Sequence, residues 1–314
     1  MNNRCLYCYE NLDSTENDYH TKCSRKFFGS DVPPETDFGL KDVDELAVKV
    51  LGKSVSVTGV QPKLSLDLKK EKREKSRLTI VGLWGDYVLK PPFDKYPEMP
   101  ENEDLTMHLA QLLKLNTAKH SLIKLKSGEL AYITRRFDRT KTAKLHVEDM
   151  AQLTEVLTER KYYSSMEKVG KAVIKYSDYS GNDALRLFEL TLFCYLTGNA
   201  DMHLKNFSLL RNEEDEIILA PAYDLLATKL LIPEDNEEIA LPINGKKNNL
   251  RKSDFDKFAA RLEIKKVVAE NVYNKVSSSL NLMASFVDKS FLKEETRNNY
   301  KGLIVSRADN LFKK

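Results

Sequence analysis

The sequence has no long apolar run and almost no net charge. No apolar segment approaches the roughly 18 residues that a membrane-spanning helix needs, and the start, MNNRCLYCYE, lacks the apolar stretch of a signal peptide. Lys and Arg number 50 against 47 Asp and Glu, so the formal net charge is +3, whereas a dedicated nucleic-acid-binding protein normally carries a clear basic excess. We therefore expect a cytoplasmic globular protein with no membrane contact and no direct nucleic-acid contact.

Cysteine is also scarce, and its distribution argues against a disulfide framework. Cys194 lies alone in the apolar segment LTLFCYL and is predicted to be a core residue. The other three cysteines and a histidine have the spacing of a structural Zn²⁺ site with two ligand pairs: Cys5, Cys8, His20 and Cys23. Because a module of about 25 residues cannot bury enough apolar area to fold alone, Zn²⁺ is expected to stabilise it as a structural cap. Unliganded thiols near the chain start are the alternative.

Changes in pattern along the chain predict an α+β protein in three parts. Residues 1–30 form the Cys/His module and are followed by a proline-containing connector. Residues 31–137 continue with a short amphipathic helical stretch, KDVDELAVKVLG. Four strand patterns follow between residues 54 and 135, interrupted by one helix: SVSVTG, PKLSLDL, RLTIVGLWGDYVLK and LAYITRRF. Residues 138–314 are mostly helical in pattern. This order predicts a strand-rich N-lobe and a helical C-lobe, with the chemistry expected where the two lobes meet.

Three local features refine this plan. A helix is expected near residues 102–115, with Asn102 as its cap, and another near residues 182–197, ended by Gly198 in the left-handed conformation. The basic tract at residues 69–77 lies between two strand patterns. It is predicted to be a solvated hairpin tip, with a phosphate-binding patch as the alternative.

The segment TGNADMHLKNFSLL at residues 197–210 is the sharpest candidate for a catalytic loop. Asp201 and Asn206 stand five residues apart, as do the catalytic Asp and the metal-binding Asn of a protein-kinase catalytic loop. Asp224 follows after a predicted strand pair, where a kinase-like fold supplies a second carboxylate for Mg²⁺. Taken alone, the spacing also fits an ordinary polar turn.

A lysine and a glutamate precede this loop in the order that a kinase requires. Lys90 ends the strand pattern WGDYVLK, and Glu103 in the next helix is able to orient it for contact with ATP phosphates. Taken alone, Lys90 is better explained as a strand-end lysine that extends into solvent. The preceding segment, SVSVTGVQPK, has Gly59 as its one glycine and therefore lacks the Gly-x-Gly-x-x-Gly phosphate loop of protein kinases. Its hydroxyl groups also fit the polar face of a strand.

Several segments together resemble successive motifs of the HipA-type serine/threonine kinases. These are toxins of bacterial toxin–antitoxin modules with a two-lobed, protein-kinase-like fold. The resemblance runs from about Ser54 to the C-terminal helices and is most specific in the catalytic-loop segment. It is carried by GVQPKLSL, YVLKPP, ENEDLTMHLA, AYITRRFDR, HVEDMAQL, GNADMHLKNFSLL and APAYDLLA.

The resemblance implies roles for individual residues around ATP and Mg²⁺. Asp201 would be the catalytic carboxylate, and Asn206 and Asp224 would hold Mg²⁺. Lys90 would contact the ATP phosphates, with His203 close to them.

The resemblance also implies roles for the adenine and phosphate-loop segments. The backbone from Arg135 to Phe137 would grip adenine at the hinge between the lobes. Ser56 matches the serine that such kinases autophosphorylate, and Thr58 is a secondary candidate. The phosphate loop would be formed by the backbone of four successive residues: Val57, Thr58, Gly59 and Val60.

The chain departs from the longer HipA proteins in one respect. They carry a further subdomain of about a hundred residues before the phosphate loop, whereas this chain has only some fifty residues there. It resembles the short, HipT-like form, in which a separate small protein supplies the missing piece and a helix-turn-helix antitoxin binds the complex. By the same resemblance, the protein substrate belongs to a class such as the aminoacyl-tRNA synthetases.

Two other functions remain open on the residues alone. A catalytically silent scaffold would bind nucleotide within an antitoxin–repressor complex without transferring phosphate. A zinc-dependent DNA-binding regulator would contact DNA through the Cys/His module. The near-neutral net charge of the chain argues against this function.

Overall fold

The computed structural model describes residues 3–43, 45, 61–69, 76–81, 84–140 and 143–312. The chain divides into two compact units. Unit 1 comprises Met1–Leu105, Ala118–Arg136 and Lys289–Leu292, and unit 2 comprises Thr106–Thr117, Phe137–Asp288 and Lys293–Lys314. The three-part division at residues 30 and 137 that the sequence pattern suggests stays a prediction.

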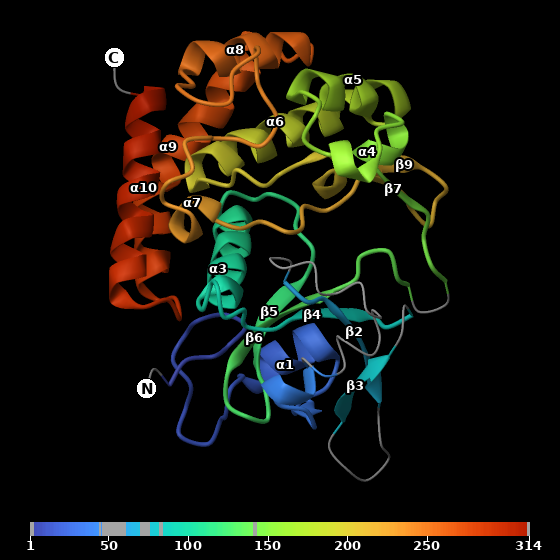
Figure 1. Cartoon of the computed structure of the whole chain (residues 1–314), viewed down its shortest axis with the longest axis vertical. Helices are drawn as coiled ribbons and strands as arrows, with labels where there is room; N and C mark the ends of the chain where they lie inside the picture. The colour runs from blue at the N-terminus through green and yellow to red at the C-terminus, as the bar shows by residue number, and fades with distance from the viewer. Residues whose placement is uncertain are drawn as a thin grey trace. The chain divides into compact units, whose positions relative to one another are not determined.

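Unit 1 is built on a six-stranded sheet (Figure 1), in the order β1-β3-β2-β4-β6-β5. All neighbouring strands are antiparallel except β1 and β3. Alternation in β2 buries Leu64 and Leu66, as expected for a strand with one covered face. The strands are β1 (Glu35–Thr36), β2 (Leu64–Lys69), β3 (Arg77–Val81), β4 (Tyr87–Lys90), β5 (His120–Lys124) and β6 (Leu130–Arg135).

Two of the helices whose bounds the structure describes lie wholly or partly in unit 1. The short helix α1 (Thr21–Phe28) carries Cys23 of the Cys/His module and ends at Gly29, which is left-handed with φ of 73°. Helix α3 (Met99–Leu112) begins in unit 1 and continues into unit 2. It begins three residues before the predicted start, because Pro100 is compatible with the first turn of a helix, so Asn102 lies inside the helix and is not its cap.

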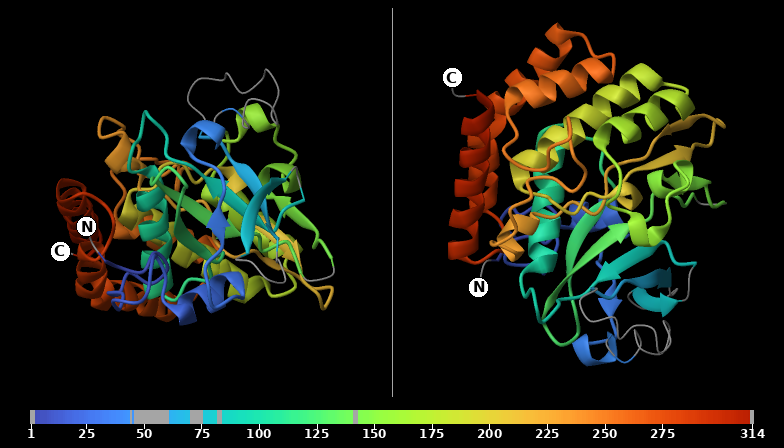
Figure 2. Two further views of the ribbon diagram at one scale, coloured as in Figure 1. Left: turned by 90° about the horizontal axis from the view of Figure 1, so that it is seen from below. Right: turned by 45° about the horizontal axis from the view of Figure 1, so that its top comes forward.

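Unit 2 contains a three-stranded antiparallel sheet and most of the helices. The sheet has the order β7 (Val147–Asp149), β8 (Ser208–Arg211) and β9 (Ile217–Leu219). The helical segments are α4 (Met150–Leu153), η2 (Thr158–Arg160), α5 (Met166–Tyr176), α6 (Ser180–Thr197), η3 (Leu204–Asn206), α7 (Thr228–Leu231), α8 (Lys252–Arg261), α9 (Lys266–Asp288) and α10 (Glu294–Phe312). In Figures 1 and 2, the red helix α10 lies along the orange helix α9, and it also packs against α6.

Helix α6 supplies the buried centre of unit 2. Leu187, Phe188 and Leu192 are fully buried, and Cys194 is 3% exposed, as predicted for a core residue. Burial raises the pKa of the Cys194 thiol well above its usual range, so this cysteine stays protonated. Among the described helices, none is both long enough and apolar enough to span a bilayer.

The basic tract connects two strands of one hairpin. Lys69 at the end of β2 pairs with Arg77 at the start of β3 in an antiparallel register. This pairing agrees with the predicted hairpin. The residues at its tip, 70–75, lie outside the described part of the chain.

Candidate functional site

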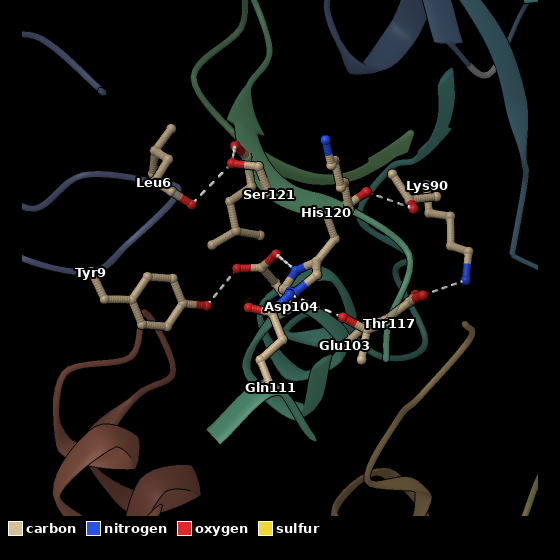
Figure 3. A network of polar contacts seen from close by, with 12 residues as sticks. Leu6, Tyr9, Lys90, Glu103, Asp104, Gln111, Thr117, His120 and Ser121 are labelled. Carbon is tan, nitrogen blue, oxygen red and sulfur yellow. Dashed lines mark hydrogen bonds and ion pairs between the residues drawn. The ribbon is translucent and has the colours of Figure 1, made fainter. Parts of the chain in front are cut away.

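Lys90 and Glu103 form a buried ion pair in unit 1 (Figure 3). Lys90 is the last residue of β4 and lies opposite Tyr132 of β6, and its Nζ atom is 2.6 Å from Glu103 Oε1. The two side chains are 6% and 2% exposed. The ammonium also lies 5.3 Å from the centroid of the Tyr132 ring, a cation–π distance. The alternative of a lysine extending into solvent is therefore wrong, because the charge is buried against a carboxylate and an aromatic face.

The segment before Lys90 is anchored close to it. Gln61 is 7% exposed, and its Nε2 donates to the carbonyl oxygen of Pro91 over 2.7 Å. Pro91 directly follows Lys90, so the described residue next to the predicted phosphate loop is tied to the end of β4. The loop residues themselves lie outside the described residues: Ser56, Val57, Thr58, Gly59 and Val60.

The predicted catalytic loop of unit 2 begins where α6 ends. Gly198 closes the helix with φ of 67°, a left-handed conformation that favours glycine, and a Cβ at this position would displace the Leu303 side chain, whose Cδ2 would lie 2.7 Å away. The hydroxyl of Thr228 in α7 donates to the Gly198 carbonyl over 3.1 Å and accepts from the Ala200 amide over 2.8 Å. Thr228 thus holds the turn that leads into Asp201.

Hydrogen bonds inside the loop fix Asp201 relative to Asn206. The Asp201 amide donates to Asn199 Oδ1 over 3.1 Å, and its carbonyl accepts from the His203 amide over 2.8 Å and from Asn206 Nδ2 over 3.1 Å. The side chain of Asp201 is exposed, whereas Asn206 is buried. Because the Asn206 amide nitrogen is used within the loop, its Oδ1 oxygen is the atom left to meet a ligand.

Asp224 is held next to this loop by the residue before it. The Tyr223 hydroxyl donates to the carbonyl of Lys205 over 2.8 Å and shares a hydrogen bond with Ser208 Oγ over 2.7 Å. Its ring also lies 5.3 Å from that of Phe137. Asp224 itself has φ of 60°, a left-handed conformation that aspartate tolerates better than most residues.

His203 lies within electrostatic range of both carboxylates. Burial lowers its pKa, the charges of Asp201 and Asp224 raise it, and Lys161 lowers it, with a net downward shift. The imidazole is therefore neutral at pH 7. Its Nδ1 atom is buried and has no hydrogen-bond partner among the described residues. The structure of unit 2 thus brings together four residues predicted from the sequence: Asp201, His203, Asn206 and Asp224.

Tyr162, which no sequence motif indicated, also belongs to this group. Tyr162 follows η2, and its hydroxyl donates to Asp201 Oδ1. Its ring contacts the His203 ring edge to face, with centroids 5.1 Å apart. Burial and the neighbouring Asp201 carboxylate raise the pKa of Tyr162, so its hydroxyl remains a proton donor.

Two backbone amides of the predicted adenine segment already donate hydrogen bonds within unit 1. The Arg135 amide donates to the carbonyl of Lys119 over 2.8 Å, and the Arg136 amide donates to the carbonyl of Asp86 over 2.8 Å. These two donors are therefore already used. An adenine contact from this segment has to come from Phe137 or from carbonyl oxygens.

The N-terminal Cys/His cluster has the geometry of a closed metal site. The ligand atoms of Cys5, Cys8, His20 and Cys23 all lie within 4.8 Å of one another. His20 Nδ1 is 3.3 Å from Cys8 Sγ and 3.7 Å from Cys23 Sγ. Tetrahedral Zn²⁺ with bonds of about 2.1 Å to nitrogen and about 2.3 Å to sulfur places such atoms roughly 3.6 Å apart. The donor set therefore fits one Zn²⁺ ion.

Neighbouring groups orient the ligands of this cluster. His20 Nε2 lies 2.9 Å from the carbonyl of Asn11, which leaves Nδ1 to face the sulfur atoms. The backbone amide of His20 donates to Cys5 Sγ over 3.4 Å. Hydrogen bonding from Cys8 lowers the pKa of the Cys5 thiol to about 5, so a thiolate is present at neutral pH.

Comparison with known proteins identifies related chains. A family model described as HipA-like C-terminal domain matches residues 55–283. The chain is 30% identical over 248 residues to "Putative kinase Y4dM" of Sinorhizobium fredii, which covers 75% of this chain and 59% of that protein. It is 29% identical over 207 residues to "Serine/threonine-protein kinase toxin HipA" of Shewanella oneidensis, covering 59% of this chain and 45% of that protein. The chain thus spans about half to three fifths of the length of these two relatives.

A solved structure supports the fold. HipA in the Shewanella oneidensis MR-1 toxin–antitoxin complex of HipA, HipB and operator DNA matches with a TM-score of 0.68 and 21% identity. The match covers 82% of this chain and 65% of that chain. The α+β fold predicted from the sequence is therefore confirmed as one that resembles HipA.

Proposed function

The chain belongs to the family of HipA-like C-terminal domains, and from this membership we propose that it is an ATP- and Mg²⁺-dependent serine/threonine protein kinase. The observation that carries the proposal is the loop of unit 2, where the Asp201 carbonyl is hydrogen-bonded to the Asn206 amide group. This bond fixes the position of Asn206, whose amide oxygen is buried, relative to Asp201, whose carboxylate is exposed. Asp224 contributes a second carboxylate close to His203.

In the proposed reaction, Asp201 accepts the proton of the acceptor hydroxyl as that oxygen attacks the γ-phosphorus. The bond from the γ-phosphorus to the β,γ-bridging oxygen breaks, and ADP leaves. Asn206 Oδ1 and the Asp224 carboxylate are the ligands for Mg²⁺, because this ion prefers hard oxygen donors. Bound there, Mg²⁺ would neutralise charge on the phosphates. The neutral His203 would lie beside the phosphates without adding charge.

In unit 1, Lys90 is the proposed contact to the ATP phosphates and Glu103 keeps it oriented. The backbone from Val57 to Val60 is the proposed phosphate loop, and the anchoring of Gln61 next to Lys90 supports this. Phe137 is the proposed amide contact to adenine.

We further propose that the kinase is the toxin of a toxin–antitoxin system. It would phosphorylate a protein such as an aminoacyl-tRNA synthetase and autophosphorylate at Ser56, with Thr58 as the secondary site. A separate small protein and a helix-turn-helix antitoxin are the proposed partners. The similar solved structure is a toxin–antitoxin complex that contains HipA, HipB and operator DNA, and this composition supports an antitoxin partner.

Transfer of ³²P from γ-labelled ATP tests the proposal. Labelling of the chain, or of a protein acceptor from the host bacterium, is expected in the presence of Mg²⁺ and not with EDTA. Nucleotide binding with no transfer to any acceptor would instead indicate a silent scaffold.

Replacing Tyr162 by phenylalanine is expected to lower kcat about tenfold while the KM for ATP stays within about twofold. The variant keeps the ring against His203 but removes the hydroxyl that holds the Asp201 carboxylate. Steady-state kinetics measure both constants. The control is Tyr163→Phe, because Tyr163 is its direct neighbour and is 78% exposed. Equal effects of the two substitutions would contradict a positioning role for Tyr162.

We also propose that the N-terminal cluster binds one structural Zn²⁺ ion. Cys8→Ser is expected to reduce bound zinc from about one ion per chain to below about 0.2, and to lower the melting temperature, because metal binding contributes to folding. Elemental analysis of the purified protein measures the metal. Cys194→Ala is the matched control, since Cys194 is buried in α6 away from the cluster. Absence of zinc from wild-type protein purified without chelators would contradict the site.

A further inference from the structure

Tyr9 links the Cys/His cluster to the helix that carries Glu103. It directly follows the ligand Cys8 and is fully buried. Its φ is 64°, and its amide donates to the Cys5 carbonyl over 2.9 Å. A left-handed conformation is unfavourable for a bulky residue and persists only where surrounding structure maintains it. The hydrogen-bonded turn that brings Cys5 and Cys8 together maintains it here.

The side chain of Tyr9 ends at a buried carboxylate (Figure 3). The Tyr9 hydroxyl donates to Asp104 Oδ2 over 2.7 Å, and Asp104 Oδ1 lies 2.6 Å from His120 Nδ1. Asp104 is fully buried and His120 is 1% exposed. A buried carboxylate depends on such partners, because its charge has lost water. Tyr9 and His120 therefore fix the orientation of Asp104.

Fixing Asp104 also fixes Glu103. The two residues are consecutive in α3, so rotation of this helix turn about its axis moves both side chains together. A second route reaches the same pair: the His120 ring stacks on the Tyr132 ring, with centroids 6.1 Å apart and planes at 19°. The Lys90 ammonium lies over that Tyr132 ring. Lys90 thus contacts a ring on which His120 stacks, and Glu103 directly precedes the carboxylate that Tyr9 and His120 hold.

We propose that the metal-filled Cys/His cluster positions the Lys90–Glu103 pair through Tyr9 and Asp104, and so sets the affinity of the protein for ATP. This inference rests on the proposed kinase function. Tyr9 and Asp104 are positioning residues, since they act through the ion pair and do not touch the nucleotide. This path leads from the Cys/His cluster at the chain start to a nucleotide-binding side chain through residues that the structure describes.

The test is Tyr9→Phe in the full chain, with equilibrium binding of a fluorescent ATP analogue in the presence of Mg²⁺. The substitution keeps the ring that packs on Phe291, with centroids 5.0 Å apart, and removes the hydroxyl that reaches Asp104. We expect the dissociation constant to rise about 3- to 30-fold. Zinc content should remain at the wild-type level.

Tyr19→Phe is the matched control. The Tyr19 hydroxyl is also buried, shares a hydrogen bond with Ser121 Oγ over 3.1 Å and donates to the Leu122 carbonyl, so it joins the same module to β5. It does not hydrogen-bond Asp104, so Tyr19→Phe leaves the Tyr9 and His120 hydrogen bonds of that carboxylate in place. If Tyr9 only helps to dock the module, the two substitutions will change nucleotide affinity equally, and that result would overturn the inference.

A second arm removes the metal. Chelation followed by dialysis is expected to weaken nucleotide binding at least about tenfold in wild type, and added Zn²⁺ should restore it. In Tyr9→Phe, which has already lost the link, the same treatment should have a smaller effect. Unchanged affinity in both Tyr9→Phe and the metal-free protein overturns the inference and leaves the kinase proposal standing. Failure of the wild type to bind the analogue at all refutes the kinase proposal, and the inference with it.

Discussion

Asp201→Asn is expected to reduce phosphoryl transfer about 10²- to 10⁴-fold, because it removes the group proposed to accept the proton of the attacking hydroxyl. The amide has nearly the same shape, and the loop contacts involve the Asp201 backbone, so the loop should stay intact. The affinity for the ATP analogue with Mg²⁺ should change less than about threefold. Single-turnover transfer and equilibrium binding, measured on the same preparation, separate the two effects.

Asp215→Asn is the control for this substitution. Asp215 also lies in unit 2, and its side chain is 82% exposed and paired with Arg211 at the surface. Surface pairs of this kind contribute little, so transfer and stability should both be close to wild type. If Asp201→Asn retained more than about a tenth of wild-type transfer, proton acceptance by Asp201 would be refuted.

Lys90→Met is expected to have the second large effect, on both nucleotide binding and stability. It removes the proposed phosphate contact and leaves the buried Glu103 carboxylate without its lysine. Breaking a buried pair in this way costs about 3–5 kcal/mol of unfolding free energy. Nucleotide affinity should fall at least about tenfold. Chemical denaturation and nucleotide titration measure the two quantities.

The double variant Lys90→Met/Glu103→Gln separates these causes. Neutralising residue 103 removes the buried charge, so most of the lost stability should return. Nucleotide affinity should not return, because the ammonium is still missing. Recovery of affinity together with stability would mean that Lys90 acts only through folding and does not contact phosphate.

Local sequence signals predicted the elements that dominate their own neighbourhoods. The run of apolar residues before Gly198 predicted both α6 and its left-handed end, because glycine is the residue that this conformation favours. The pairing of Lys90 with Glu103 also followed from their order on a strand and the next helix. In the candidate site, the motif spacing was enough to bring Asp201 and Asn206 together.

Other features depend on contacts between distant segments and were missed. Strand β5 was not predicted, because its segment, His120–Lys124, carries two polar residues that are buried by partners from elsewhere in the chain. His120 is satisfied by Asp104, and Ser121 donates to the Leu6 carbonyl over 3.1 Å. Strand β7 is only three residues long, too short for alternation to be recognised.

The same reason explains the two tyrosines that the sequence did not single out. Tyr162 reaches Asp201 across 39 positions of the chain, and Tyr9 reaches Asp104 across 95. No spacing rule connects residues so far apart. Tyrosine is common both in cores and on surfaces, so residue type alone was no guide.

Mass spectrometry of the intact chain after incubation with ATP and Mg²⁺ tests the central claim most directly. The account predicts that wild type gains a phosphoryl group, that peptide mapping locates it at Ser56 or secondarily at Thr58, and that Asp201→Asn does not gain it. If wild-type protein shown to bind nucleotide transferred phosphate neither to itself nor to any protein of a host extract, the kinase account would be contradicted.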